Sequence, residues 1–519
     1  MAMTILEMRH ITKIYSNGFI ANNDVCFSAD AGEIHALVGE NGAGKTTLMK
    51  VLFGIEKPEK GEVLLYGKPI QIKSSADAIG HGIGMVHQHF MLVDSLTVAE
   101  NMVLGLQSGF GVFSYEDAVK RTLEVAEKYG LPVDPHAKIR DLPVGMKQRI
   151  EILKALLRGA QILILDEPTA VLTPQETGEL FEQLKTIKKD GHTIIFISHK
   201  LKEIKAFCDR ITVLRAGRSI GVCETANVTE QAISRMMVGR DVLLTIDKRP
   251  TKPGDTILAV KKLGCRNGNK DVLRNVSFQI RAGEILGVAG VEGNGQRELS
   301  EMITGLRTYE TGSIQILGHE AGNISVKQIR ELGTSHISED RMTYGVIQNG
   351  SIEENIMADR YEQKMYQFGP LLNGKRLRLL TEDLIRDYQI KCDGYDQPVR
   401  MLSGGNMQKV VAAREFSSQP KLIIANQPTR GIDIGASEFI RNRLIALRDA
   451  GAAILLISAD LNEVMEVSDR VIVMCGGEIT ARYDDARQIT EEELGEYMLG
   501  VRRQIAESGE GEADESQKN

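Results

Sequence analysis

Two glycine-rich segments that could cradle phosphate groups begin 251 residues apart (290 − 39). The first follows an apolar run, Ile34–Val38, that predicts a strand, and it reads Gly39-Glu40-Asn41-Gly42-Ala43-Gly44-Lys45-Thr46. In such a loop the backbone N–H groups wrap the phosphates, the lysine contacts the β- and γ-phosphates, and the hydroxyl holds Mg²⁺. A helix beginning near Lys45 would add donors and a positive dipole. The second segment, Gly290–Arg297, keeps the glycine frame but lacks the lysine and the hydroxyl.

Two carboxylates that could act on a bound phosphate follow the apolar run Ile162–Leu165. Asp166, at the end of the expected strand, could orient Mg²⁺ through water, and Glu167 could polarise an attacking water as a general base. A lone Asp-Glu pair is more often a solvated strand end, but here it follows an intact phosphate loop. The corresponding residues of the second half are Asn426 and Gln427, which cannot do this chemistry.

Matching landmarks show that the chain contains the same unit twice. Ala31–Ile34 recurs as Ala282–Ile285 at an offset of 251, whereas Leu142 matches Leu402 and Ser198 matches Ser458 at 260. The second copy therefore carries nine extra residues (260 − 251), which we place between Asp340 and Arg400. The expected domains are residues 1–246 and 256–502, joined by a proline-containing linker at 247–255 and followed by a disordered acidic tail at 503–519.

Composition narrows the functional classes. A net charge of −7 argues against a nucleic-acid binder, and the six scattered cysteines contain no C-x-x-C pair for a zinc site. The chain has no apolar run of about 18 residues and no leader-like start, so we expect membrane association only through a partner. The histidines His81, His87 and His89 cluster near one loop, and loop polarity explains them better than a metal site does.

The apolar runs predict an α/β fold with a buried parallel sheet in each half. Runs such as Ile162–Leu165 and Thr193–Ile197 have strand length, and they alternate with helical patterns such as Thr177–Lys189. We expect residues 90–140 to be mostly helical.

These motifs resemble those of the tandem ATP-binding cassette (ABC) proteins. The resemblance covers about Ile5 to Val501, and it includes the signature Leu402-Ser403-Gly404-Gly405-Asn406 in the second half. It implies two tandem P-loop ATPase cassettes, each with an α/β core and a helical subdomain, that bind ATP and Mg²⁺ and form a pseudo-dimer within one chain.

The resemblance also implies roles for further residues. Gln88 would be the Q-loop residue that senses Mg²⁺ and the transport partner, and His199 would contact the γ-phosphate and the attacking water. Tyr15 would stack on adenine, although a partly buried sheet-edge tyrosine is the alternative. The predicted catalytic residues are Glu167, His199 and Gln88; the predicted metal-binding residues are Thr46, Gln88 and Asp166. The predicted ATP-binding residues are Tyr15, the loop from Gly39 to Thr46, Thr47, and Ser403, Gly404 and Gly405.

Because ABC cassettes pair head to tail, each site would combine one phosphate loop with the signature of the other cassette. The first-half signature has become Leu142-Pro143-Val144-Gly145, which lacks the serine hydroxyl and one glycine. One composite site carries all of the losses: the lysine, the carboxylates, the histidine (Ala459 replaces His199) and this signature. The sequence therefore predicts a single hydrolysis-competent site, whereas random decay would affect both.

Within the family, the motifs are most similar to those of ATP-binding subunits of bacterial nucleoside importers, with importers of sugars such as ribose or galactose as the alternative. The resemblance implies two membrane permease subunits, an extracytoplasmic solute-binding protein as an indirect partner, no nucleic acid, and a peripheral position on the cytoplasmic face of the membrane. A soluble tandem ABC factor acting on ribosome or DNA is a weaker alternative, because such proteins usually keep both sites and have a long charged linker, whereas here one site is lost and the linker is short. A third alternative is a regulator that binds ATP without hydrolysing it, and the intact Glu167 argues against this alternative.

Overall fold

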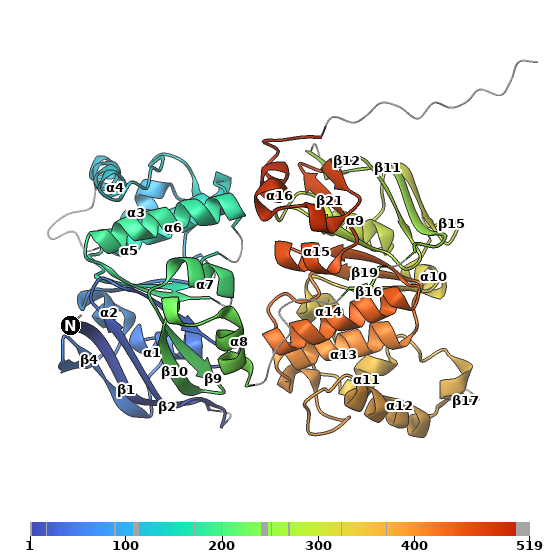
Figure 1. Cartoon of the computed structure of the whole chain (residues 1–519), viewed down its shortest axis with the longest axis horizontal. Helices are drawn as coiled ribbons and strands as arrows, with labels where there is room; N and C mark the ends of the chain where they lie inside the picture. Colours follow the sequence, from blue (N-terminus) through green and yellow to red (C-terminus); the bar gives the residue numbers. More distant parts are fainter. Residues whose placement is uncertain are drawn as a thin grey trace, which may run out of the picture. The chain divides into compact units, whose positions relative to one another are not determined.

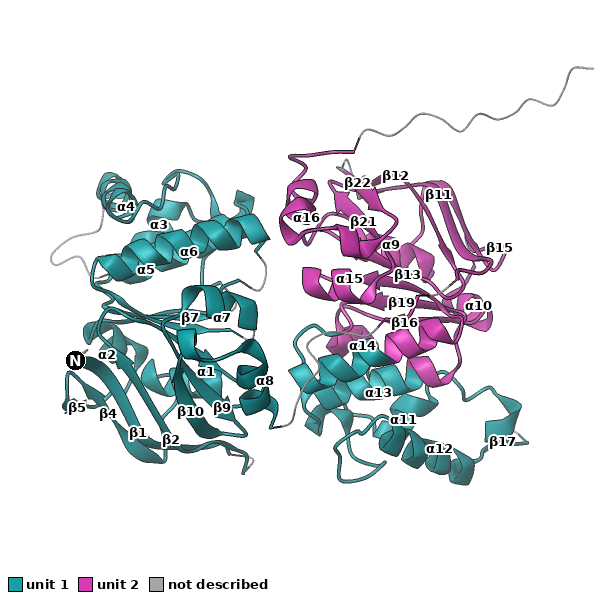
Figure 2. Cartoon of the chain, viewed as in Figure 1, with its two compact units in different colours: residues 1–246, 346–414, 429–442 teal, residues 247–345, 415–428, 443–519 magenta. Residues whose placement is uncertain are grey.

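The computed structural model describes residues 3–16, 18–87, 90–106, 114–169, 172–198, 200–239, 248–250, 252–267, 270–322, 324–369 and 371–504. The chain divides into two compact units (Figure 2). Unit 1 comprises residues 1–246, 346–414 and 429–442, and unit 2 comprises 247–345, 415–428 and 443–519. Within the described ranges, no helix has the length and apolar character needed to cross a membrane.

The first cassette is built on a six-stranded sheet whose buried strands are short apolar runs (Figure 1). Its strand order is β10 (Arg218–Glu224), β9 (Arg210–Arg215), β3 (Ile34–Val38), β8 (Thr193–Ile197), β7 (Ile162–Asp166) and β6 (Ile83–Val86). Neighbouring strands are parallel except β9 and β10. A second, antiparallel sheet has the order β2 (Ile20–Asp30), β1 (Thr4–Ile14), β4 (Lys60–Leu65) and β5 (Lys68–Ile70).

Eight α-helices accompany these sheets in the described part of the first cassette. They are α1 (Lys45–Leu52), α2 (Ser75–Gly80), α3 (Val98–Val103), α4 (Tyr115–Tyr129), α5 (Val144–Leu157), α6 (Pro174–Lys189), α7 (Leu201–Phe207) and α8 (Glu230–Val238).

The expectation that residues 90–140 are mostly helical is only partly correct. Of the described residues there, α3 and α4 are helical, together with a short 3-10 turn at Ile139–Asp141. The chain leaves α4 at Gly130, whose φ of 64° ends the helix in a left-handed conformation, and prolines follow at 132 and 135.

The second cassette repeats this plan with the same strand order. Its six-stranded sheet runs β22 (Glu478–Tyr483), β21 (Arg470–Cys475), β13 (Ile285–Ala289), β20 (Ala453–Ile457), β19 (Leu422–Asn426) and β16 (Thr334–Ile337). Its antiparallel sheet runs β12 (Lys270–Arg281), β11 (Thr256–Asn267), β14 (Thr311–Ile316) and β15 (His319–Glu320).

The helices of the second cassette correspond to those of the first, with additions. They are α9 (Gln296–Ile303), α10 (Val326–Glu331), α11 (Ile352–Met357), α12 (Gly374–Asp387), α13 (Gly404–Ser417), α14 (Ile434–Asp449), α15 (Leu461–Val467) and α16 (Glu491–Met498). A π-helical turn at Arg341–Gly345 and a small hairpin of β17 (Gln367–Phe368) and β18 (Leu371–Leu372) lie between β16 and α12.

Candidate active site

The intact phosphate loop connects the buried strand β3 to helix α1, as the sequence predicts. Gly44 precedes the helix with φ of 96°, and a Cβ on it would lie 2.3 Å from the carbonyl oxygen of Ala21, so glycine is required there. Lys45 is the first residue of α1, and its Nζ donates to the carbonyl oxygens of Gly39 (2.7 Å) and Glu40 (3.0 Å). The loop therefore encloses the ammonium group at the helix N-terminus, where phosphate oxygens would be favoured.

The charged groups behind this loop are buried together. Lys45 and Asp166 are only 5% and 4% exposed. Burial lowers the pKa of Lys45, whereas the negative charges of Glu167 and Asp166 act to raise it. Burial raises the pKa of Asp166, the charge of Glu167 raises it further, and a hydrogen bond from the Thr46 hydroxyl opposes both.

This arrangement fits a Mg²⁺ ion bound with a triphosphate. Thr46 and Asp166 offer two oxygen ligands side by side, and hard oxygen donors are the ones that Mg²⁺ prefers. A cation there would also relieve the cost of holding the Asp166 carboxylate charged in a buried position.

Glu167 has a strained backbone that the second cassette repeats. Its φ is 49° and that of Gln427 is 52°, a left-handed conformation that is costly for residues with a side chain. Their N–H groups donate equivalently, to the carbonyl oxygens of Ile197 (2.9 Å) and Ile457 (2.7 Å). The turn that aims the side chain is thus preserved in both cassettes, and only the first keeps the carboxylate.

Tyr15 lies beside the phosphate loop. Its hydroxyl is 3.3 Å from Oγ1 of Thr47, the third residue of α1, and the Lys13 ammonium stands 5.6 Å from the centroid of its ring. Tyr15 is half-buried. In this position the ring can stack on the base of a nucleotide whose phosphates lie in the loop. The adenine-stacking role of Tyr15 remains a prediction.

The second-half signature immediately precedes and opens helix α13. Ser403 Oγ accepts from the backbone N–H of Asn406 (3.3 Å) and from its side-chain amide (2.9 Å). A Cβ on Gly405 would lie 2.4 Å from Oδ2 of Asp433, so a larger residue would force the Asp433 carboxylate to move. In the first half, Pro143 occupies the cap of α5 and makes no side-chain cap bond.

Two residues of the phosphate loop reach the segment that carries Asp433, all within unit 1. Asn41 Nδ2 donates to the carbonyl oxygen of Ile432 (3.0 Å), and Glu40 Oε1 accepts from the N–H of Gly435 (3.4 Å). Since Gly405 packs on Asp433, one short segment touches both the loop and the signature. Sequence reasoning predicted Glu40 and Asn41 as ATP contacts and missed these side-chain bonds. The only signal was their replacement by Val291 and Glu292 in the second copy.

In and around the second phosphate loop, neutral side chains make the hydrogen bonds. Gln296, where Lys45 would be, donates to the carbonyl oxygen of Val291 (3.2 Å). Asn426 donates to Ser300 Oγ (3.2 Å), and Gln427 Oε1 accepts from Ala459 N–H (3.1 Å). Arg297 pairs instead with Glu301 one turn along α9, at 2.9 Å. No described side chain of this loop offers the ammonium-plus-carboxylate chemistry of the first site.

Two predicted catalytic residues, Gln88 and His199, lie outside the described residues.

The neighbouring His87 is described, and its ring packs edge-on against Phe53 with centroids 5.9 Å apart. It lines a pocket of about 220 Å³ with apolar walls, including Ile79, Met85 and Met91. Glu151 accepts from the N–H of Met91 (2.6 Å) and Lys154 donates to its carbonyl oxygen (3.1 Å) at the same place. Burial raises the pKa of Glu151.

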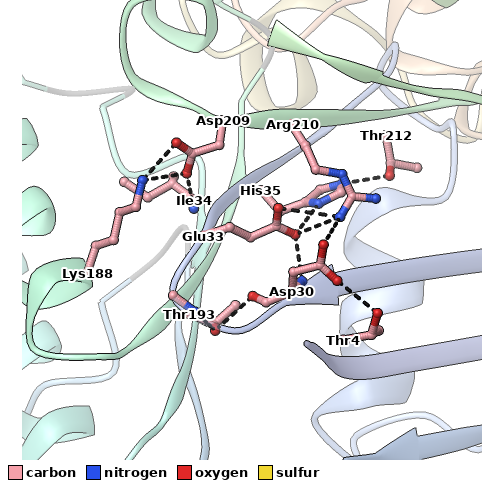
Figure 3. Close-up of polar contacts among 11 residues, drawn as sticks. Thr4, Asp30, Glu33, Ile34, His35, Lys188, Thr193, Asp209, Arg210 and Thr212 are labelled. Atoms are coloured by element: carbon pink, nitrogen blue, oxygen red, sulfur yellow. Dashed lines mark hydrogen bonds and ion pairs between the residues drawn. The ribbon is translucent and has the colours of Figure 1, made fainter. Parts of the chain in front are cut away.

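A buried polar network that sequence reasoning did not anticipate supports the strand leading to the phosphate loop (Figure 3). His35 is fully buried on β3, with Nδ1 2.9 Å from Glu33 Oε1 and Nε2 2.7 Å from Thr212 Oγ1. Arg210 bridges Glu33 (3.3 Å) and Asp30 (2.9 Å). The second cassette keeps the ion pair as Glu284 and Arg470 (3.1 Å) but has Leu286 in place of the histidine.

This network predicts a pH-dependent contribution to stability. Burial alone would raise the pKa of Glu33, but the hydrogen bonds from His35 and the Asp30 N–H and the Arg210 charge lower it below its ordinary 4.5. A depressed carboxyl pKa stabilises the fold above pH 4.5, and this contribution is lost as the pH falls through the lower folded value. We expect Glu33→Gln to cost about 1–3 kcal/mol of unfolding free energy near neutral pH and progressively less in acid. Chemical denaturation of both forms across this pH range measures the difference, and a constant gap would contradict the assignment.

Both halves of the chain match one known protein family. A family model described as "ABC transporter" matches residues 22–170 and 273–430. The chain belongs to the ABC transporter family. The "Guanosine import ATP-binding protein NupO" of Bacillus subtilis (strain 168) is 43% identical over 98% of this chain and 99% of its own length.

A second relative and a solved structure extend this result. The "Glucose import ATP-binding protein TsgD13" of Haloferax volcanii is 40% identical over 95% of this chain and 96% of that protein. The archaeal ribosome recycling factor aABCE1, solved in complex with the ribosomal stalk protein aP1, is 18% identical and covers 91% of this chain and 90% of its own, with a TM-score of 0.61. That likeness concerns the fold alone. The chain is thus a tandem ATP-binding subunit, the ATPase component of an ABC transporter.

Proposed function

We propose that this ABC ATPase subunit powers the import of nucleosides and hydrolyses ATP at one composite site. The observation that carries the mechanistic part is the contrast between the two loops. The first encloses a buried lysine beside two carboxylates, and the second is closed by neutral amides. The substrate class is supported by motif resemblance and by the printed function of the guanosine-import relative.

At the proposed site, residues of this chain bind the triphosphate, orient Mg²⁺ and polarise the attacking water. Loop N–H groups and Lys45 hold the phosphate oxygens, and Thr46 and Asp166 would hold Mg²⁺, which neutralises phosphate charge when bound. Glu167, fixed by its left-handed backbone, takes a proton from the attacking water. The Ser403 hydroxyl and the amides of Gly404 and Gly405 supply donors to the γ-phosphate from the other cassette. Gln88 and His199 complete the proposed set.

The coupling of hydrolysis to transport would run through the pocket beside His87. Its apolar walls with Glu151 and Lys154 at one side suit a short amphipathic helix from a permease. We propose two membrane permease subunits as partners, a solute-binding protein as an indirect one, and a peripheral position on the cytoplasmic face of the membrane.

Uptake measurements test the substrate assignment. Deleting the gene should lower uptake of a labelled purine nucleoside, the chain should restore it, and the Lys45→Ala form should not. Lys45 is the right control because its loss removes ATP use without touching any element that selects the solute. The glucose-import relative supports the alternative of sugar import. Normal nucleoside uptake with lost monosaccharide uptake would establish that alternative and leave the one-site mechanism intact.

A further inference from the structure

The hairpin of β17 and β18 lies in the second cassette between α11 and α12, at the edge of its helical segment (Figure 1). It falls where the two copies differ in length. From α11 to α12 the helix starts are 22 residues apart (374 − 352), against 17 from α3 to α4 (115 − 98). Five of the nine extra residues of the second copy are therefore located here, within the region where the sequence placed them.

The hairpin is firmly attached to its surroundings within unit 1. Arg360, just before it, is 4% exposed, pairs with Asp359 at 2.9 Å and donates to the carbonyl oxygen of Arg414 at 2.6 Å. Arg376 of α12 donates to the carbonyl oxygen of Met365 (2.8 Å), and Gln367 Nε2 donates to that of Tyr361 (2.9 Å). These bonds give the segment a defined conformation.

This fixed segment exposes large apolar side chains. We call Tyr361, Met365, Phe368, Leu371 and Leu372 the hairpin patch; all are exposed, with Phe368 at 78% and Leu371 at 69%. Phe368 and Leu371 are directly paired across the hairpin, so their side chains share one face, while Leu372 pairs with Gln367 on the other. Apolar groups clustered outward on an ordered segment indicate an interaction surface.

The flanks of the hairpin patch are cationic, although the chain as a whole is acidic. Residues 361–379 contain Lys364, Lys375, Arg376 and Arg378 against one acid, Glu362, a net charge of +3 (4 − 1) in a chain of net charge −7. All four cations belong to exposed residues. Arg378 is partly engaged, since it lies 3.8 Å from Glu353.

We propose that the hairpin patch docks on an anionic lipid surface. Apolar side chains emerge on both faces of a narrow two-stranded ribbon, and a lipid interface can surround both faces whereas a flat protein partner covers one. Aromatic rings with flanking lysines and arginines are the side chains that favour the interface of a membrane with anionic lipids. A second copy of this chain would bring the same positive charge to the contact, which opposes self-association.

The proposed lipid contact goes beyond the proposed function and departs from the expectation that the chain reaches the membrane only through a partner, because it needs neither the solute nor the permeases. Its experiment uses the full chain and vesicles alone, so a failed nucleoside assignment leaves it standing, and its own failure leaves the ATPase and import assignments standing.

The chain contains no tryptophan, so Phe368→Trp places a single fluorescent reporter in the hairpin patch. With vesicles of phosphatidylcholine and phosphatidylglycerol, we expect its emission to shift to the blue and to be quenched by lipids brominated in their acyl chains. Pure phosphatidylcholine vesicles should give little change, and added salt should weaken the effect. The matched control is Val222→Trp. Val222 lies on strand β10 and is 47% exposed. The emission of a tryptophan at this position should stay constant.

A second variant tests the charge. Adding Lys364→Gln and Lys375→Gln to the Phe368→Trp form should weaken vesicle binding about fivefold for each charge, or about 25-fold together. An unchanged Phe368→Trp emission with anionic vesicles would overturn the proposal. So would an equal shift in the Val222→Trp control, or a concentration-dependent shift without vesicles, which would indicate self-association. A shift that appears only with permeases and persists without anionic lipid would assign the patch to a protein partner instead.

Discussion

Replacing the proposed general base, Glu167→Gln, should lower steady-state ATP turnover by the assembled transporter roughly 10²–10⁴-fold. ATP binding should persist, because the amide keeps the shape of the side chain and Lys45, Thr46 and Asp166 are untouched. The backbone that aims residue 167 should also survive, since the second cassette holds a glutamine with almost the same φ, 52° against 49°. A phosphate-release assay with a parallel ATP-binding measurement checks both parts.

The matched control for this experiment exists within the chain. Gln427→Glu restores a carboxylate on the equivalent turn, but its site still lacks the lysine, the histidine and an intact opposing signature. Turnover should therefore change little. Vigorous hydrolysis by the Glu167→Gln form, or a marked gain from Gln427→Glu, would show that the second site is active.

Removing the phosphate-loop ammonium, Lys45→Ala, should abolish productive ATP binding and lower turnover by at least about 10²-fold, the range for losing one strong preorganised donor. The reason is that Lys45 is the buried positive charge of the loop, at 5% exposure, held by the carbonyl oxygens of Gly39 and Glu40. Nucleotide titration and an ATPase assay measure the two effects.

Gln296→Ala is the corresponding change in the second loop. It removes only a neutral hydrogen bond to Val291, and we expect ATP turnover to stay within about twofold of the native chain. If the two substitutions impaired turnover equally, both loops would contribute to hydrolysis and the asymmetry inferred from their contacts would be wrong.

Sequence patterns predicted the central architecture well because it rests on short-range signals. The run Thr193–Ile197 forms β8 with the same bounds, and the helix expected at Lys45 begins there. The predicted helix at Thr177–Lys189 begins three residues earlier, at Pro174, because Thr173 and Glu176 form a capping box with proline in the first turn. The π-helical turn at Arg341–Gly345 gave no comparable signal.

The parts that could not be predicted depend on contacts between residues distant in the sequence. The bond from Asn41 to Ile432 spans 391 residues, and that from His35 to Thr212 spans 177. Periodicity and motif spacing carry no information about such pairs. The sequence also indicated where the second copy has extra residues, but it did not reveal that they form a hairpin that exposes Phe368 and Leu371.

The central claim, one hydrolytic site per chain, is tested most directly by counting trapped nucleotide. When the assembled transporter hydrolyses ATP in the presence of orthovanadate, a phosphate mimic, each working site should retain ADP. We predict one ADP per chain, unaffected by Gln296→Ala and lost in the Lys45→Ala form. Two trapped ADP molecules per chain, or retention of one after Lys45→Ala, would contradict the one-site account.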